Sequence, residues 1–473
     1  MHFLREMNRV LVGLLIAFAL IALAAAYWGV ASSGSLLSRD DNPRLVELEN
    51  RIQRGAIYDR AGTLLVNSEP DEFGVVTRQY LFPAFYSALG YSSLRYGVGG
   101  LESAYNALLR GDTAEAITAY ELLHRPIRGS DLQLTLDANI QNALYAAMNG
   151  QRGAAIVLSI PDGQTLAMVS LPTFDPNYLD EQWDTLNANP NNPFFNRALQ
   201  GSYQPGGTME TPLMMGALLS TQALDEEIED GSAPFDLNGL EITCAVRLPL
   251  MPMTLRDGYA FACPTPFVQL GESLGSARLQ SLFDQVQSLT QYRLLPIQPV
   301  SNGTATPETT AQLLTTEDEL LANVLGQGNI TVTPLMMAMI AGAVANDGNA
   351  PQPYLLEAIR SPGEATWQPV ETAHPTVPIT TANTARRLQD LMRYNVVNGA
   401  AQNAGRPFID IGGHASLAYS GDTTNAWFIG FATLGGRQAV AIAIVLENSA
   451  DAGLASDIGG STLQAASAAL AGS

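Results

Sequence analysis

The pattern of apolar and polar positions begins with one long segment that carries no charge. Val10 to Ala31 spans 22 residues, which is long enough to cross a bilayer core of about 30 Å as a helix. Arg5 and Arg9 precede this segment and Tyr27-Trp28 lie near its far end, a pattern typical of a basic cytoplasmic flank and an interfacial aromatic pair. The pattern predicts a single transmembrane helix.

This prediction gives the chain a cytoplasmic tail at residues 1–9, a transmembrane helix at residues 10–31 and all later domains on the outer side. A cleavable signal peptide is the competing interpretation, because Ala24-Ala25-Ala26 offers small residues to a peptidase. The apolar run is longer than the ~7 to 15 residues usual for a signal peptide, which favours the uncleaved anchor in the cytoplasmic membrane.

Shorter periodic segments follow the anchor. Residues 54–66 alternate like two strands around a turn that Gly62 closes, which predicts a hairpin. Residues 100–111 predict a helix that a glycine ends. The short polar link near residues 128–131 then suggests a domain boundary, so residues 32–130 are predicted to form a stalk and a small α+β domain.

The remainder, residues 131–473, alternates strands and helices. Residues 131–148 predict a strand followed by a helix with Asp137 as its N-cap. The other predicted elements are hairpins at residues 152–170 and 425–449, a short strand and a helix begun by Pro334 within residues 325–348, and a closing helix at residues 457–472.

Composition narrows the chemistry, because all 24 basic residues are arginine and lysine is absent. An average chain of this length holds roughly 20 to 30 lysines. The absence excludes a Schiff-base lysine, a P-loop lysine and a Ser–Lys dyad. A mutational bias of the genome would produce the same loss, so the absence alone does not establish a new function.

Charge and metal-binding residue types exclude further classes. The net charge of -21 would repel phosphate backbones, so nucleic acid is not an expected partner. An acidic solvated surface accounts for this charge without any specific partner. The histidines at positions 2, 124, 374 and 414 are far apart in sequence, and with two cysteines they suggest no metal cluster and no cofactor.

Five short segments occur in an order that resembles class B penicillin-binding proteins, closest to the short elongation-type members of actinobacteria. They are RGAIYDRAG from Arg54, Gly100-Leu101-Glu102, LTLDANIQ from Leu134, Phe174-Asp175-Pro176-Asn177, and Gly326-Gln327-Gly328 with Val332-Thr333-Pro334-Leu335. The resemblance implies an α/β chain with a pedestal, or dimerisation-like, domain and a transpeptidase domain of the serine β-lactamase type, an antiparallel sheet flanked by helices.

The resemblance also implies acyl transfer on peptidoglycan stem peptides. In the family a serine in Ser-x-x-Lys attacks, and Ser-x-Asn and Lys-Thr/Ser-Gly groups handle protons and substrate. Here SYQPGGTME from Ser202 places Gly207 at the nucleophile and Glu210 at the lysine. Gly207 has no side chain, and Glu210 reverses the expected charge. Thr208 lies about 100° around the helix, where we expect it to cap backbone N–H groups.

The other two motifs are altered as well. In MTLRDGYAFACPTPF from Met253, Ala262 replaces the serine and Pro264 the asparagine. Before Trp427-Phe428 the best match to the third motif is Tyr419-Ser420-Gly421, in which tyrosine replaces lysine. No lysine exists elsewhere that a different alignment could supply.

The remaining candidate residues have ordinary interpretations beside the functional ones. Cys244 and Cys263 are 19 positions apart on the exported side, so they form either a disulfide or two buried thiols. No histidine is near Cys263 in sequence to activate it as a nucleophile. His414 is close to the third motif, although a surface or capping role is more typical. Thr208, Cys263 and Thr423 are candidate polar side chains of a ligand cleft.

The sequence thus predicts a membrane-anchored, catalytically inactive transpeptidase homologue that acts as a scaffold or regulator of cell-wall synthesis. Its expected partners are cell-wall synthesis or division proteins in the membrane, and peptidoglycan stem peptides are a further candidate. One alternative is an active transpeptidase or hydrolase with a site rebuilt from Thr208, Ser420, Cys263 or His414. Another is a sensor that binds a muropeptide or a β-lactam without chemistry.

Overall fold

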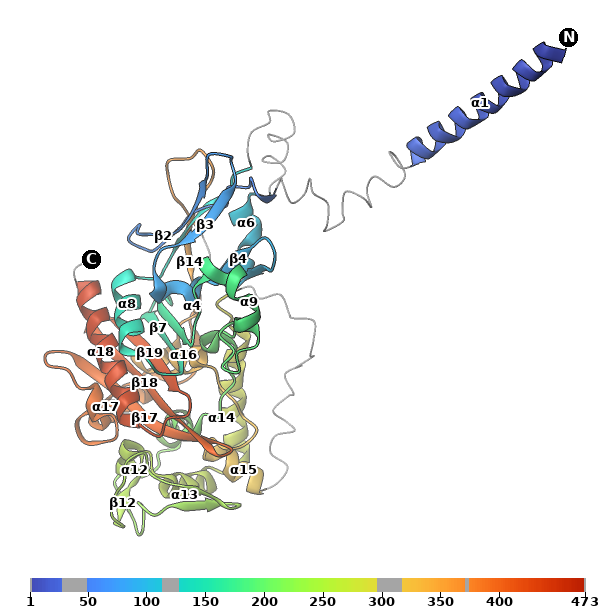
Figure 1. Ribbon diagram of the computed structural model, residues 1–473. Coiled ribbons are helices and arrows are strands. Elements are labelled where there is room, and N and C mark those ends of the chain that lie inside the picture. Colours follow the sequence, from blue (N-terminus) through green and yellow to red (C-terminus); the bar gives the residue numbers. More distant parts are fainter. Residues whose placement is uncertain (1, 28–48, 113–126, 296–316, 371–373, 472–473) are drawn as a thin grey trace.

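The computed structural model describes residues 2–27, 49–112, 127–295, 317–370 and 374–471 (Figure 1). Helix α1 (His2–Ala26) contains residues 10–26 of the predicted anchor. Within the described residues it is the one helix long and apolar enough to cross a membrane. It begins eight residues before the predicted start at Val10, and residues 28–31 of the predicted span lie outside the described residues.

The pedestal is built on a six-stranded mixed sheet. Its strand order is β15 (Gln368–Pro369), β14 (Leu356–Arg360), β6 (Asp131–Leu134), β1 (Ile57–Tyr58), β2 (Leu64–Pro70) and β3 (Val76–Tyr80). Strands β1 and β2 form the predicted hairpin, closed by Gly62 at a φ of 87°. Strands β6, β14 and β15 come from beyond residue 130, so later parts of the chain complete the pedestal sheet.

A buried ionic cluster fixes the pedestal. The Glu102 carboxylate is fully buried and lies 2.6 Å from guanidinium nitrogens of both Arg54 and Arg78. Tyr80 donates its hydroxyl to the same carboxylate at 3.2 Å. Burial alone would raise the pKa of Glu102, but the two guanidinium charges outweigh burial and lower it. The cluster therefore stays ionised at neutral pH.

The predicted helix at residues 100–111 is in fact two short helices, α5 (Leu101–Ala104) and α6 (Asn106–Arg110). They meet at Tyr105, whose φ of -110° and ψ of 24° break the helical path. Gly111 ends α6 in the left-handed conformation, as the prediction of a glycine stop required.

The second part of the chain is a five-stranded antiparallel sheet covered by helices on both faces. The strand order is β17 (Asp410–Ser420), β18 (Thr423–Gly435), β19 (Gln438–Leu446), β7 (Gly153–Ile160) and β8 (Thr165–Leu171). Helices α8 (Ala138–Ala147) and α18 (Ala452–Ala471) pack on one face. Asp137 caps α8 as predicted, and both predicted hairpins are present.

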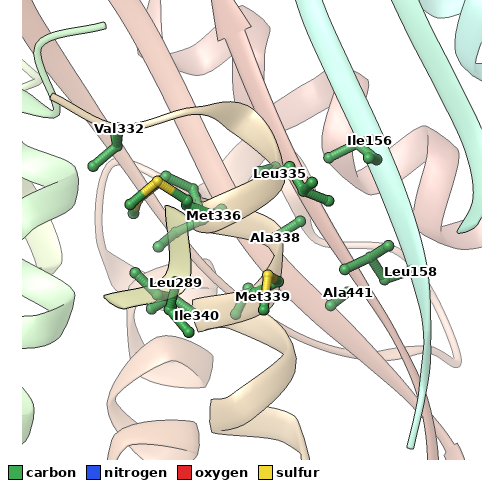
Figure 2. Close-up of a cluster of buried hydrophobic side chains, with 14 of the residues drawn as sticks. Ile156, Leu158, Leu289, Val332, Leu335, Met336, Ala338, Met339, Ile340 and Ala441 are labelled. Atoms are coloured by element: carbon green, nitrogen blue, oxygen red, sulfur yellow. The ribbon is translucent and has the colours of Figure 1, made fainter. Parts of the chain in front are cut away.

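Helix α16 (Pro334–Ala345) covers the other face and is almost entirely buried. Figure 2 shows its side chains Leu335, Ala338 and Met339 beside Ile156 of β7 and Ala441 of β19. Each fully buried large aliphatic side chain contributes roughly 1.5–3 kcal/mol of burial free energy. Pro334 begins α16 as predicted, whereas the predicted short strand before it is only a bridge from Val332 to Tyr203. This sheet-and-helix core holds the elements that carry the predicted motif positions.

Candidate functional site

Three elements meet at Gly207. They are the 3-10 turn η4 (Gly206–Met209), which leads into helix α11 (Glu210–Leu219), the link between helices α12 (Leu255–Phe261) and α13 (Pro264–Leu274), and strand β17. A Cβ built on Gly207 would lie 2.8 Å from Cβ of Ser416 and 3.4 Å from Cβ of Ala262. A contact of 2.8 Å between two carbons is well inside their usual separation of about 3.5–4.0 Å. The Ser416 side chain therefore occupies the space that a side chain at position 207 would need.

The residue before Gly207 brings the turn η4 into close contact with strand β17. Gly206 has a φ of 51°, and its N–H donates to the carbonyl of Gly326 at 2.9 Å. Its Cα faces the backbone of Leu417 and Ala418 so closely that a Cβ there would collide with both. The Pro205-Gly206 step therefore sets η4 directly on β17, because only glycine combines this conformation with this approach.

Glu210 and His414 form a buried pair one turn further along. The Glu210 Oε2 atom lies 3.4 Å from Nε2 of His414, and both side chains are at least 94 % buried. The imidazole stacks on the Tyr259 ring, with a centroid distance of 4.4 Å and an interplanar angle of 8°. The Tyr259 hydroxyl shares a hydrogen bond of 2.9 Å with Thr211. His414 thus lies in the interior rather than on the surface, contrary to the more typical role expected from sequence.

The hydrogen bonds assign the tautomer of His414. Its Nε2 lies 3.0 Å from the Gly207 carbonyl, which can only accept, so Nε2 carries the hydrogen. Its Nδ1 then accepts from the Asn395 side-chain amide at 3.4 Å. This arrangement of donors and acceptors fits a neutral imidazole.

Burial disfavours the charged form of both members of the pair. It raises the pKa of Glu210 well above its usual value. Burial also lowers the pKa of His414 to about 4, although the hydrogen bond to Gly207 opposes this change. A neutral pair also agrees with the geometry, because Nε2 is nearer to the Gly207 carbonyl than to Glu210. Burial therefore opposes the reversal of charge expected at position 210.

Thr208 and Pro264 offer no reactive group to this site. The Thr208 hydroxyl is buried and donates to the Pro205 carbonyl at 2.5 Å. We expected this hydroxyl to cap backbone N–H groups, but it bonds to a carbonyl instead. Pro264 is the first residue of α13, a position that requires no N–H. Ala262 ends α12 with a φ of 50° and presents only its methyl group to Gly207.

The structure joins Cys244 and Cys263 in a disulfide. Cys263 is fully buried, and with its partner it lies in a small apolar cluster with Met253. The bond ties the segment before α12 to the link that carries Ala262. Cys263 therefore has no free thiol to act as a nucleophile.

The third-motif candidates lie at the hairpin that joins β17 to β18. Tyr419 lies at the end of β17, where its hydroxyl contacts that of Thr243 at 3.2 Å. Ser420 and Thr423 are exposed partners across the hairpin tip, and the Thr423 hydroxyl donates to the Ser420 carbonyl at 2.8 Å. Gly421 makes the turn with a φ of 58°. These residues, including the proposed cleft residue Thr423, do not gather at Gly207.

The side chains of β17 that do face the site are His414 and Ser416, two residues apart and on one face of the strand. Asn395 and Tyr259 complete their surroundings. The register of the hairpin is the signal that could have identified these two residues. A turn at Gly421 pairs Ser416 with Trp427, and the sequence prediction did not use this pairing. Within the described ranges, no three His, Cys, Asp or Glu side chains are grouped to hold a metal.

Comparison with known proteins identifies the family. Residues 153–466 match the penicillin binding protein transpeptidase domain, and residues 54–125 match the penicillin binding protein A dimerisation domain. The chain belongs to the class B penicillin-binding protein transpeptidases.

Relatives and solved structures agree with this assignment. The chain is 29 % identical to peptidoglycan D,D-transpeptidase PbpA of Mycolicibacterium smegmatis, with 98 % of each chain covered. It is 28 % identical to PbpA of Mycobacterium tuberculosis over the same shares. The imipenem acyl-enzyme complex of penicillin-binding protein A from M. tuberculosis superposes with a TM-score of 0.75 at 28 % identity, covering 89 % of this chain and 99 % of that one.

Proposed function

We propose that this protein is a catalytically inactive class B penicillin-binding protein that serves cell-wall synthesis as a membrane-anchored scaffold or regulator. The observation that carries the proposal is Gly207. An acyl-enzyme needs a hydroxyl or thiol at the attacking position, and this position has no side chain and no room for one beside Ser416.

The charge of the site supports the same proposal. Catalysis by this family requires a base near the nucleophile and a cation for the substrate carboxylate. Glu210 holds its proton because burial raises its pKa, and His414 is neutral because burial lowers its pKa to about 4. A neutral pair that is hydrogen-bonded within the fold neither deprotonates a hydroxyl nor attracts an anion.

We infer that the three family motifs lie at Gly207 to Glu210, at Ala262 to Pro264, and at His414 to Ser416. In the third motif His414 then stands for the lysine and Ser416 for the glycine. Serine and glycine have thus exchanged places between the first and third motifs. This exchange accounts for the close fit of Ser416 against Gly207.

The alternative of a rebuilt enzyme lacks support among its four candidate residues. Thr208 is bonded to a carbonyl inside the turn, and Cys263 is in a disulfide. Ser420 is exposed at a hairpin tip, and His414 is committed to Gly207 and Asn395. None of the three hydroxyl or thiol groups contacts a base in the described part of the chain.

Placement in the cell follows from the anchor. We propose that the N-terminus is cytoplasmic, because Arg5 and Arg9 precede the apolar helix. A stalk and pedestal at residues 32–130 and a transpeptidase-like domain at residues 131–473 would then face outward. The protein would work beside cell-wall synthesis or division proteins of the same membrane.

A fluorescent penicillin tests the proposal. We expect no band after denaturing electrophoresis of the full-length protein. PbpA of M. tuberculosis is the positive control, since its solved structures include penicillin G and imipenem acyl-enzyme complexes. A denaturation-resistant fluorescent adduct on this chain would overturn the proposal.

A further inference from the structure

A pocket of about 350 Å³ lies between the pedestal and the transpeptidase-like domain, away from Gly207. One side is formed by pedestal residues 86–104 and the other by residues 170–200. Ligand sites in proteins commonly measure about 300–1,000 Å³ and favour domain interfaces. The volume and position are therefore those of a small-molecule site.

The walls of this pocket are aromatic and carry no charge. Tyr91, Phe174 and Phe194 face it, with Phe174 and Phe194 in edge contact at a centroid distance of 4.8 Å. Trp183 supports Phe194 from behind at 5.1 Å. None of the described residues that line the pocket is Asp, Glu, Arg or His, in a chain of net charge -21. An ionic ligand would find no counter-charge there.

Some polar groups of the lining are already committed to the fold. Ser87 accepts from the backbone N–H of Ser170, and Ser170 donates to the Phe195 carbonyl. The Asn196 amide donates to the Ser87 carbonyl at 3.0 Å. These bonds hold the two walls in fixed relation, which lowers the entropy cost of binding.

Other polar groups remain available. Half-buried Tyr91 and exposed Ser103 and Gln200 are among the lining residues, and neither their hydroxyls nor the side-chain nitrogen of Gln200 form a hydrogen bond with a described residue. Burial raises the pKa of Tyr91, so its hydroxyl is a neutral donor. An apolar ligand that covered the half-buried Tyr91 hydroxyl would leave it unpaired, which costs free energy.

We propose that this pocket binds one ring of an uncharged N-acetylated hexosamine, the neutral sugar of a peptidoglycan glycan strand. The C–H face and acetyl methyl of such a sugar pack on aromatic rings, and its hydroxyl and amide groups meet Tyr91, Ser103 and Gln200. The choice of sugar rests on the proposed cell-wall function, whereas the neutral, aromatic character of the site rests on the lining alone.

Calorimetric titration of the full-length protein with N,N′,N″-triacetylchitotriose tests the proposal. The protein is held in a polyoxyethylene detergent, because sugar detergents would compete. We expect saturable binding with a Kd on the order of 0.1–1 mM. Cellotriose, which lacks the acetamido groups, should bind at least tenfold more weakly. The proposal would be overturned if triacetylchitotriose showed no saturable binding at concentrations 10-fold above this Kd range, or if cellotriose bound equally well.

Matched variants locate the site. Ser103→Trp fills the pocket and should abolish binding, whereas Ala107→Trp, at an exposed position of α6 outside the lining, should not. Tyr91→Phe removes only the hydroxyl and should weaken binding about 5-fold. This second variant still tests the proposal if the Ser103→Trp protein does not fold. Binding unaffected by both Ser103→Trp and Tyr91→Phe would contradict the proposal. Penicillin labelling stays independent of these results, so the two proposals fail separately.

Discussion

Replacing Gly207 by serine should destabilise the protein and restore no activity. The added Cβ would lie 2.8 Å from Cβ of Ser416, so β17 or η4 must move. Overpacking of this kind typically costs about 1–3 kcal/mol. The neighbouring Ala262 methyl at 3.4 Å leaves little room for the turn to shift the other way.

Ser416→Gly supplies the compensating change. Alone it should cost about 0.5–1 kcal/mol, because glycine loses more backbone entropy in a strand. Combined with Gly207→Ser it removes the colliding carbon, so the double variant should be more stable than the sum of the single effects predicts. We expect a coupling free energy of about 1–2 kcal/mol, within the range seen for residues in contact.

Thermal unfolding of the full-length protein in detergent measures these effects. A change of 1 kcal/mol shifts Tm by roughly 2–4 °C in domains of 150–250 residues, and by less in larger ones. Gly216→Ser is the matched control on α11, because its Cβ meets only the flexible ends of Leu282 and Leu274. If Gly207→Ser left Tm unchanged and showed no coupling to Ser416→Gly, the contact between β17 and the turn would not exist as described.

Three further predictions concern buried groups. Glu210→Gln should remove part of the pH dependence of the free energy of unfolding. Because the pKa of Glu210 is raised in the folded state, its contribution to stability is complete below about pH 4.3 and is lost as pH rises, by at most about 1.4 kcal/mol per pH unit. Equal pH profiles of the variant and the wild type in chemical unfolding would refute a protonated Glu210. Cys244→Ser should lower the free energy of unfolding by about 2–4 kcal/mol, since the bond closes a loop with a separation of 19 residues; an unchanged urea midpoint would contradict this. Glu102→Gln should cost about 3–5 kcal/mol at pH 7, because it removes the counter-charge of two largely buried arginines, Arg54 and Arg78. Because the pKa of Glu102 is lowered, this difference should shrink as pH falls below about 4.3 through the folded-state pKa, and a difference independent of pH would argue against an ionised carboxylate.

Local sequence patterns predicted the fold well because its elements are bounded by residues with strong conformational preferences. Asp137 caps α8, Pro334 begins α16 and Gly62 closes the first hairpin. The helix predicted at residues 100–111 differs more from the structure, since no residue in that segment is typical of a helix break at Tyr105. Strand β6 joins the pedestal sheet by pairing with β1, with Leu132 opposite Ile57, and β14 joins it by pairing with β6 across more than 200 residues. Periodicity contains neither pairing.

Adjacent residues anchor the first two motif predictions, and the structure brings Gly207 and Ala262 together, but it does not bring the third-motif candidates to them. Tyr419-Ser420-Gly421 resembles the family triplet locally, whereas the pairing of β17 with β18 decides which strand residues face Gly207. The role of His414 depends on burial and on a contact with a residue 207 positions away. Its neutral state follows from that environment and has no counterpart in the sequence pattern.

The intact mass of the full-length protein after prolonged incubation with penicillin G tests the central claim most directly. Penicillin that acylates an enzyme adds its whole mass, since the lactam ring opens without a leaving group. We predict a single species at the unmodified mass, with PbpA of M. tuberculosis shifted by one penicillin under the same conditions. A species heavier by one penicillin that survives denaturation, and that maps to any residue of the described site, would contradict the account.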